Sequence, residues 1–143
     1  MTEATPQWPV RQEQDYRDAL QRNVMDGRNE LYFIKIGEIF FPDEDVLLAL
    51  PGSAGDDTEA LIVTTHRLLK VQFLAFRRHL RFEIPASLVA GAEYRRGFFT
   101  RLKIWRRDSR HPFKFVVGNA DDTERFVHQL NHLIATGRLP EGV

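Results

Sequence analysis

Histidines and acidic side chains are the groups in this 143-residue chain that could support metal or acid–base chemistry. His128 and His132 are four residues apart, a spacing that lets two imidazoles on one helix hold zinc. Both fall opposite the apolar stripe of a predicted helix, and no third ligand of fixed position accompanies them. We therefore interpret them as residues of a solvated helix face and predict no metal site.

The patterns of nucleophilic catalysis and cofactor binding are also missing. The chain has no cysteine, which excludes a thiol nucleophile, a disulfide scaffold and cysteine-ligated metals. Its serines lack a nucleophile-elbow context, and no glycine-rich phosphate loop precedes a helix. The acidic groups at 43–45 and 56–57 match neither a calcium loop nor a defined carboxylate pair. We predict a protein that is not an enzyme and needs no cofactor.

Two groups of basic residues could bind anions, because guanidinium forks match phosphate and carboxylate oxygens. The first group is expected in two loops between strands and comprises Arg77, Arg78, His79, Arg106, Arg107 and Arg110. The alternative interpretation is that these are exposed loop residues without a ligand.

The second basic group surrounds two aromatic residues at a predicted hairpin tip. It comprises Arg95, Arg96, Phe98, Phe99 and Arg101. Aromatics flanked by arginines suit insertion at a membrane interface, with the arginines on anionic headgroups, and they equally suit an anchor in a protein interface. A third possibility is that one or both phenylalanines fold back onto the protein.

Charge is balanced overall but segregated along the chain. The twenty Lys and Arg residues cancel twenty Asp and Glu residues. Residues 1–65 hold five basic and thirteen acidic side chains, whereas residues 66–111 hold twelve basic and three acidic ones. The two segments either face each other within the folded monomer or present a basic surface to an anionic partner. Zero net charge argues against nucleic acid as that partner, since long-range attraction to phosphates would be small.

Composition favours one globular domain. Apolar residues make up 43% and charged residues 28% of the chain, which argues against disorder. No apolar run approaches the roughly 20 residues of a membrane span, and the N-terminus carries no secretory pattern. We expect a cytoplasmic protein, with peripheral attachment to a membrane as the alternative.

The order of predicted elements is a helix, about seven short strands and a final helix. Residues 11–26 have a thin helical stripe, and residues 30–41 fit either a helix or a strand. In the fourth strand we expect Leu80, Phe82 and Ile84 to point inward. Strands are predicted at 46–50, 59–65, 67–73, 79–84, 88–94, 101–107 and 113–117. The last helix has an apolar face that includes Phe126, Val127, Leu130, Leu133 and Ile134, and Gly137 ends it.

This order resembles that of bacterial pleckstrin-homology-like (PH-like) and GRAM-like domains. Residues 60–69 resemble the family's strand–turn–strand segment, in which Thr ends one strand and Arg-Leu opens the next. Residues 82–89 resemble its fourth strand, and residues 113–117 with 121–134 resemble its last strand and closing helix. The resemblance implies a mostly β (α+β) fold of seven antiparallel strands in two sheets, with the helix plugging one end and burying Phe126 and Leu130. It assigns 38–136 to the PH-like domain, 1–37 to an N-terminal extension and 137–143 to a tail.

The resemblance also implies a binding module. In the family, loops at the open end bind phosphoinositide headgroups, but here the first of them, predicted at Pro51–Thr58, carries Asp56 and Asp57 and no basic residue. Our favoured hypothesis is therefore a non-enzymatic module for protein–protein interaction or self-association. The alternative is peripheral binding to anionic phospholipid surfaces through the basic loops and the aromatic hairpin tip.

Overall fold

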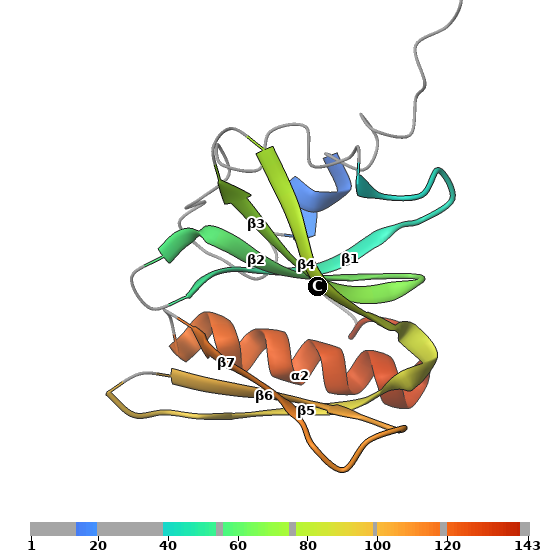
Figure 1. Ribbon diagram of the computed structural model, residues 1–143. Helices are drawn as coiled ribbons and strands as arrows, with labels where there is room; N and C mark the ends of the chain where they lie inside the picture. The colour runs from blue at the N-terminus through green and yellow to red at the C-terminus, as the bar shows by residue number, and fades with distance from the viewer. Residues whose placement is uncertain are drawn as a thin grey trace, which may run out of the picture.

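Short apolar segments separated by turn residues form strands in the computed structural model (Figure 1). The structure describes residues 14–19, 39–53, 56–74, 77–98, 100–117 and 120–140. The strands within these ranges are β1 (Val46–Ser53), β2 (Asp56–Thr64), β3 (Arg67–Leu74), β4 (Arg77–Pro85), β5 (Val89–Arg95), β6 (Thr100–Arg106) and β7 (Phe113–Val117). A short 3-10 helix, η3 (Ala86–Leu88), joins β4 to β5, and α2 (Ala120–Thr136) follows β7.

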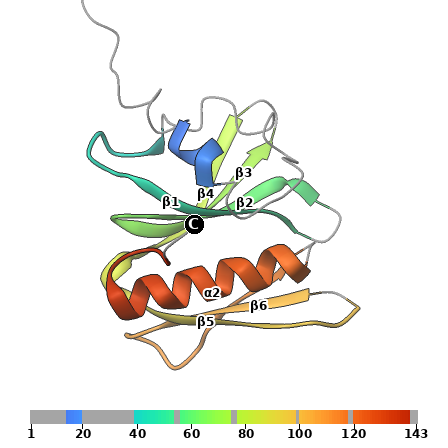
Figure 2. The same ribbon diagram turned by 180° about the vertical axis from the view of Figure 1, so that it is seen from behind.

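The strands pair in chain order into two antiparallel sheets. One sheet has the order β1-β2-β3-β4 and the other β5-β6-β7. The helix α2 lies between them, packed mainly on β5 and also on β1 (Figure 1; from behind in Figure 2). The predicted fold class, two antiparallel sheets closed by a C-terminal helix, is confirmed.

The main core fills the space between the sheets and α2. Phe126 and Leu130 are 0% and 1% exposed, as predicted, and they meet Leu48, Leu102 and other buried aliphatic side chains of both sheets. Gly137 has φ +78°, a left-handed conformation that suits glycine at the end of a helix, and its amide donates to the Leu133 carbonyl at 2.8 Å.

A second core covers the opposite face of the four-stranded sheet. Residues 14–19 are helical, and Tyr16 and Ala19 pack with Phe40 against this sheet. Both faces of β3 are consequently buried: Leu68 belongs to the first core and its neighbour Leu69 to the second, each 0% exposed. From sequence, the alternation of Leu69 and Val71 with Leu68 and Lys70 predicts a half-buried strand. This is wrong at Leu68 and Leu69, because the main core covers the face of Leu68 and the N-terminal segment covers the face of Leu69.

Two boundary predictions need correction. The expected loop Pro51–Thr58 is mostly strand, since β1 runs to Ser53 and β2 starts at Asp56. Pro51 is tolerated because β1 is an edge strand and its pairing shifts register just after Pro51. Arg77 and Arg78 likewise open β4 and do not lie in a loop.

The inward face of β4 also differs from the expected one. Lys70 pairs with Phe82 and Val71 with Leu80, so β4 carries one extra residue at this point. A β-bulge of this kind moves the following side chains to the other face. Ile84 is buried and Phe82 half-buried, as expected, but Leu80 is 44% exposed and the predicted inward orientation is wrong there.

Some predictions fall outside the described residues. These are the parts of the predicted helix 11–26 beyond 14–19, the choice between helix and strand at 30–38, and the position of Phe99. The division into an extension at 1–37, a domain at 38–136 and a tail at 137–143 stays a prediction.

Candidate functional site

The predicted aromatic hairpin is the turn between β5 and β6. We call residues 95–98 together with Arg101 the hairpin tip. Phe98 is 96% exposed at its end, the largest exposure among the large apolar side chains that the structure describes. Exposing a phenyl ring to water is unfavourable, which makes Phe98 a candidate contact residue.

One arginine fixes the hairpin tip to the start of α2. Arg96 donates to Asp121 at 2.8 Å and to Glu124 at 2.7 Å. Hydrogen bonds from Arg96 and Tyr94 hold the pKa of the Glu124 carboxyl below its ordinary value, and the two carboxylates raise the pKa of Arg96. Arg96 is thus a positioning residue for the turn and is already saturated by anionic partners.

The other two arginines of the hairpin tip face each other across the strands. Arg95 pairs in register with Arg101, and both are exposed. Like charges placed directly opposite one another are unfavourable. Neither guanidinium has an ion-pair partner among the described residues, whereas the next pair on this face, Glu93 with Lys103, is complementary at 3.8 Å. The arrangement leaves two adjacent cations next to Phe98.

The first basic group is not brought together. Arg77 and Arg78 lie at the end of the sheet where β3 turns into β4. The Arg107 amide instead donates to the Leu88 carbonyl at 2.8 Å, which puts Arg107 just past the other end of β4. The nine-residue strand β4 separates these ends, roughly 25 Å of extended chain.

The remaining members of that group have separate surroundings. Arg106 makes two bonds with Asp108, at 2.7 and 2.8 Å, and its guanidinium lies 5.5 Å from the centre of the Phe113 ring. Bonding to Arg106 lowers the pKa of Asp108. Arg110 is exposed in the following loop, and His79 is half-buried in β4. The sequence groups these residues by type, but the fold distributes them.

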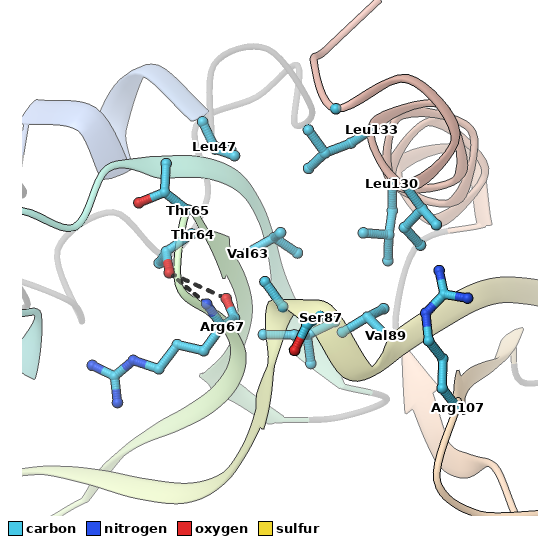
Figure 3. Close-up of a pocket in the computed structure, with 14 residues that line it drawn as sticks. Leu47, Val63, Thr64, Thr65, Arg67, Ser87, Val89, Arg107, Leu130 and Leu133 are labelled. Atoms are coloured by element: carbon cyan, nitrogen blue, oxygen red, sulfur yellow. Dashed lines mark hydrogen bonds between the residues drawn. The ribbon is translucent and has the colours of Figure 1, made fainter.

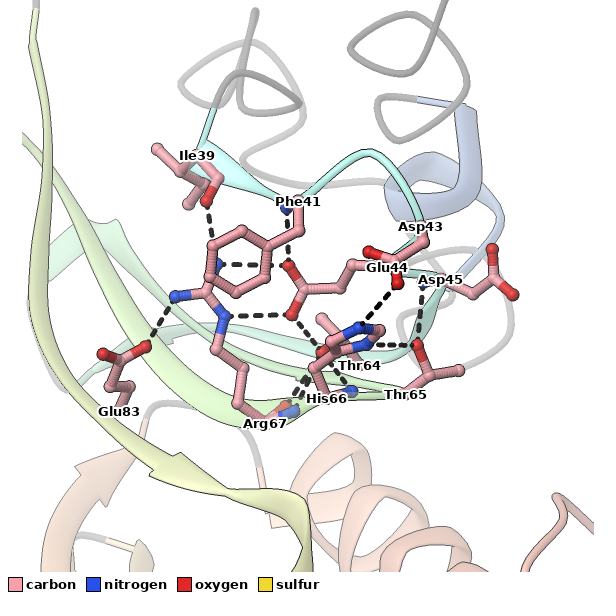
Figure 4. Close-up of polar contacts among 10 residues, drawn as sticks. All are labelled: Ile39, Phe41, Asp43, Glu44, Asp45, Thr64, Thr65, His66, Arg67 and Glu83. Atoms are coloured by element: carbon pink, nitrogen blue, oxygen red, sulfur yellow. Dashed lines mark hydrogen bonds and ion pairs between the residues drawn. The ribbon is translucent and has the colours of Figure 1, made fainter.

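A buried ion-pair network occupies the turn between β2 and β3 (Figure 4). Arg67 is 7% exposed and Glu44 is fully buried. Arg67 donates to both Glu44 oxygens, at 2.9 and 3.1 Å, to Glu83 at 2.6 Å and to the Ile39 carbonyl at 2.8 Å. The Phe41 ring covers the guanidinium at 4.6 Å. We call these residues, with Thr64, the Arg67 cluster. Each guanidinium nitrogen of Arg67 and both oxygens of Glu44 are engaged, so the cluster holds the segment before β1.

The Arg67 cluster controls the ionisation of its carboxylate. Burial alone raises the pKa of Glu44, but hydrogen bonds from Arg67, Thr64 and the Phe41 amide outweigh it and bring the pKa below the ordinary value. Thr64 and Arg67 of this cluster belong to the segment 60–69, which resembles the strand–turn–strand segment of PH-like domains. Reasoning from sequence missed its acidic partner, because Glu44 stood in an acidic run that looked like a solvated loop.

The histidines show no common site. His128 is exposed and His132 half-buried, and His132 lies 3.0 Å from the Arg138 carbonyl. His66 lies 3.3 Å from Asp43. In the part of the chain that the structure describes, no three His, Asp or Glu side chains are placed to hold a metal ion.

A pocket of about 430 Å³ opens between the β2–β3 turn, the β4–β5 link and the second half of α2 (Figure 3). Reasoning from sequence did not find it, since its walls come from segments far apart in the chain. We call it the α2 pocket. Its lining residues are Leu47, Val63, Thr64, Thr65, Arg67, Leu68, Ala86, Ser87, Val89, Arg107, Leu130, Leu133, Ile134 and Gly137.

Two solved structures share this architecture. One is a DUF1696 family protein with a pleckstrin-homology domain from Shewanella loihica PV-4, with TM-score 0.54 and 16% identity over 75% of this chain and 96% of that chain. The other is a pleckstrin homology domain from Shewanella amazonensis SB2B, with TM-score 0.57 and 15% identity over 82% of this chain and 96% of that chain. The chain therefore has a pleckstrin-homology-like fold, as its element order predicted.

Comparisons based on sequence found no match to the chain. No protein-family model matches the chain, and no curated protein matches it. Among the described residues, none of the helices has the length and apolarity required to cross a bilayer.

Proposed function

We propose that this chain is a non-enzymatic binding module that attaches peripherally to anionic phospholipid surfaces through the hairpin tip. The observation that carries the proposal is the pairing of two unneutralised guanidinium groups, Arg95 and Arg101, beside the 96% exposed ring of Phe98. An aromatic ring suits the boundary between headgroups and acyl chains, and each arginine near an anionic leaflet contributes about 1 kcal/mol.

The position of the turn supports this role. Arg96 bonds to Asp121 and Glu124, so the turn is held against α2 and presents Phe98 at a fixed edge of the molecule. A preorganised contact loses less conformational entropy on binding than a mobile loop does. The acidic partners of Arg96 lie on α2, whereas Arg95 and Arg101 share the other face of the hairpin.

Co-sedimentation with vesicles tests the proposal. The variant R95Q/R101Q should bind phosphatidylglycerol-containing vesicles about tenfold or more weakly than the native chain, with little binding of either to phosphatidylcholine. The matched control R110Q/R138Q removes the same charge from exposed arginines elsewhere. Equal losses in the two double variants would show general attraction without the hairpin tip and would overturn the proposal.

Self-association, our first hypothesis from sequence, has separate support. The strand β4 pairs only with β3 in its sheet and is therefore an edge, and it exposes 44% of Leu80. Exposed edges pair readily with a strand of a second chain. Light scattering should then give a dimer or larger species that the L80K variant converts to a monomer. A monomeric native chain would exclude this candidate and leave the membrane proposal standing.

A further inference from the structure

We infer that the α2 pocket binds a small aliphatic carboxylate, with the acyl chain in the pocket and the carboxylate on Arg107. This is a second site, independent of the hairpin tip. A volume of about 430 Å³ lies within the usual range of small-ligand pockets, roughly 300–1,000 Å³. The inference rests on the chemistry of the pocket's floor, its mouth and its single available charge.

The floor and walls are aliphatic. Val63, Leu68, Val89 and Leu130 are buried and form the floor, and all belong to the main core. The walls add Leu47, Leu133 and Ile134, which are half-buried. No aromatic side chain is among the lining residues, so the pocket offers no ring for stacking, and a flexible alkyl chain fits it better than a planar ligand.

The polar groups lie toward the mouth. Ser87 of η3 and Arg107 are exposed and bring a hydroxyl and a guanidinium to the pocket, whereas the Thr65 hydroxyl already accepts from the Asp45 amide at 3.0 Å. This combination of an apolar floor with a few polar groups is typical of sites for small molecules. An amphiphile would place its apolar end inward and its polar end beside Ser87 and Arg107.

Charge complementarity selects an anionic head. Among the residues that the structure describes, the charged ones that line the pocket are two arginines, and none of them is a carboxylate. Arg67 is satisfied by Glu44 and Glu83, and its guanidinium points away from the cavity (Figure 3). Arg107 has no ion-pair partner among the described residues, and Figure 3 shows its guanidinium on the side of α2.

The single guanidinium group of Arg107 is suited to binding one carboxylate. A guanidinium can bind either a carboxylate or a phosphate through two parallel hydrogen bonds, but its single positive charge neutralises a carboxylate fully and a phosphate monoester dianion only by half. Arg107 could instead serve only the carbonyl end of α2, since a cation there is favourable for the helix. In that case its loss would lower stability without changing ligand affinity, and the experiment below separates the two roles.

Isothermal titration with decanoate, below its micelle concentration, tests the inference, with 1-decanol as the uncharged probe. The native chain should bind decanoate more tightly than decanol. R107A should weaken decanoate about tenfold or more and leave decanol unchanged. R110A is the matched control, because Arg110 is exposed in the same loop and does not line the pocket.

A variant that fills the pocket provides a second, independent test of the inference. Ala86 is exposed and lines the mouth, so A86W should abolish binding of both probes while the thermal midpoint stays close to that of the native chain. A90W adds the same ring at an exposed position of β5 outside the pocket and should bind normally. No binding of decanoate by the native chain, equal effects of R107A and R110A, or normal binding by A86W would each overturn the inference.

Discussion

Arg67 lies where three separate segments meet, and this position determines what its replacement does. Its guanidinium joins Glu44 before β1, Glu83 on β4 and the Ile39 carbonyl. Removing one partner of a buried pair leaves an uncompensated charge, which costs more than the pair contributes. Arg67, which lies in the segment 60–69 that resembles PH-like domains, therefore has a structural role and not a binding one.

We predict that R67M destabilises the fold by about 3–5 kcal/mol, because Glu44 would remain buried without its cation. Urea unfolding followed by circular dichroism measures this. The double variant R67M/E44L removes both charges and should recover part of the loss. A double variant less stable than R67M would show that the charges are not coupled.

Acid should weaken the same cluster. The folded-state pKa of Glu44 lies below its ordinary value of 4.5, so the native state favours the ionised carboxyl. The stabilisation is complete well above pH 4.5 and is lost as pH falls through the lower folded pKa. We predict that E44Q flattens the decline of the thermal midpoint below pH 5. Parallel pH profiles of the two proteins would contradict this assignment.

At the scale of elements, the hairpin between β5 and β6 combines one stabilising and one unfavourable feature. Arg96 ties it to α2, whereas Arg95 and Arg101 repel each other across the ladder. Cross-strand like charges cost about 0.2–1 kcal/mol. A loss of stability from the pair Arg95 and Arg101 is expected if these residues serve binding.

We therefore predict that R101T leaves the fold as stable or slightly more stable, by about 0.2–1 kcal/mol, while reducing vesicle binding. Differential scanning calorimetry and co-sedimentation on the same samples give both quantities. A loss of stability together with the loss of binding would identify Arg101 as a structural residue.

The elements also show where prediction from sequence reaches its limit. The bounds of β7 were predicted correctly, and the Gly137 stop of α2 was found, because each has a local signal. The burial of Leu80 was wrong because a bulge opposite Lys70 leaves no mark in the apolar pattern. Alternation placed Leu68 and Leu69 on opposite faces of β3 but could not show that both faces are buried, since the core around Leu69 includes Tyr16, more than fifty residues away in the chain.

The same limit applies to the candidate sites. Phe98 and the paired arginines of the hairpin were accessible from sequence, since they are neighbours along the chain. Arg107 was selected for its charge but grouped with Arg77 and Arg78, from which the fold separates it. The α2 pocket was not found, because its lining comes from β1 to α2 and no local pattern joins those elements.

For the whole molecule, the segregated charges meet inside the chain at several points. Ion pairs join Glu44 to Arg67 and Glu59 to Lys70, and a polar contact joins Asp43 to His66, each linking the acidic first segment to the basic second one. The described residues thus support facing segments within one monomer. Arg95 and Arg101 of the hairpin tip lie outside this compensation and leave a local basic surface on a molecule of zero formal net charge.

The most direct test follows Phe98 itself. Because the chain contains no cysteine, F98C can be labelled at that position alone with an environment-sensitive fluorophore. S109C, in the exposed β6–β7 loop, is the control. Membrane attachment through the hairpin tip predicts a blue shift of the F98C label with phosphatidylglycerol vesicles, none with phosphatidylcholine and none for S109C. A label at position 98 that stays in water while the protein co-sediments with vesicles would contradict the account.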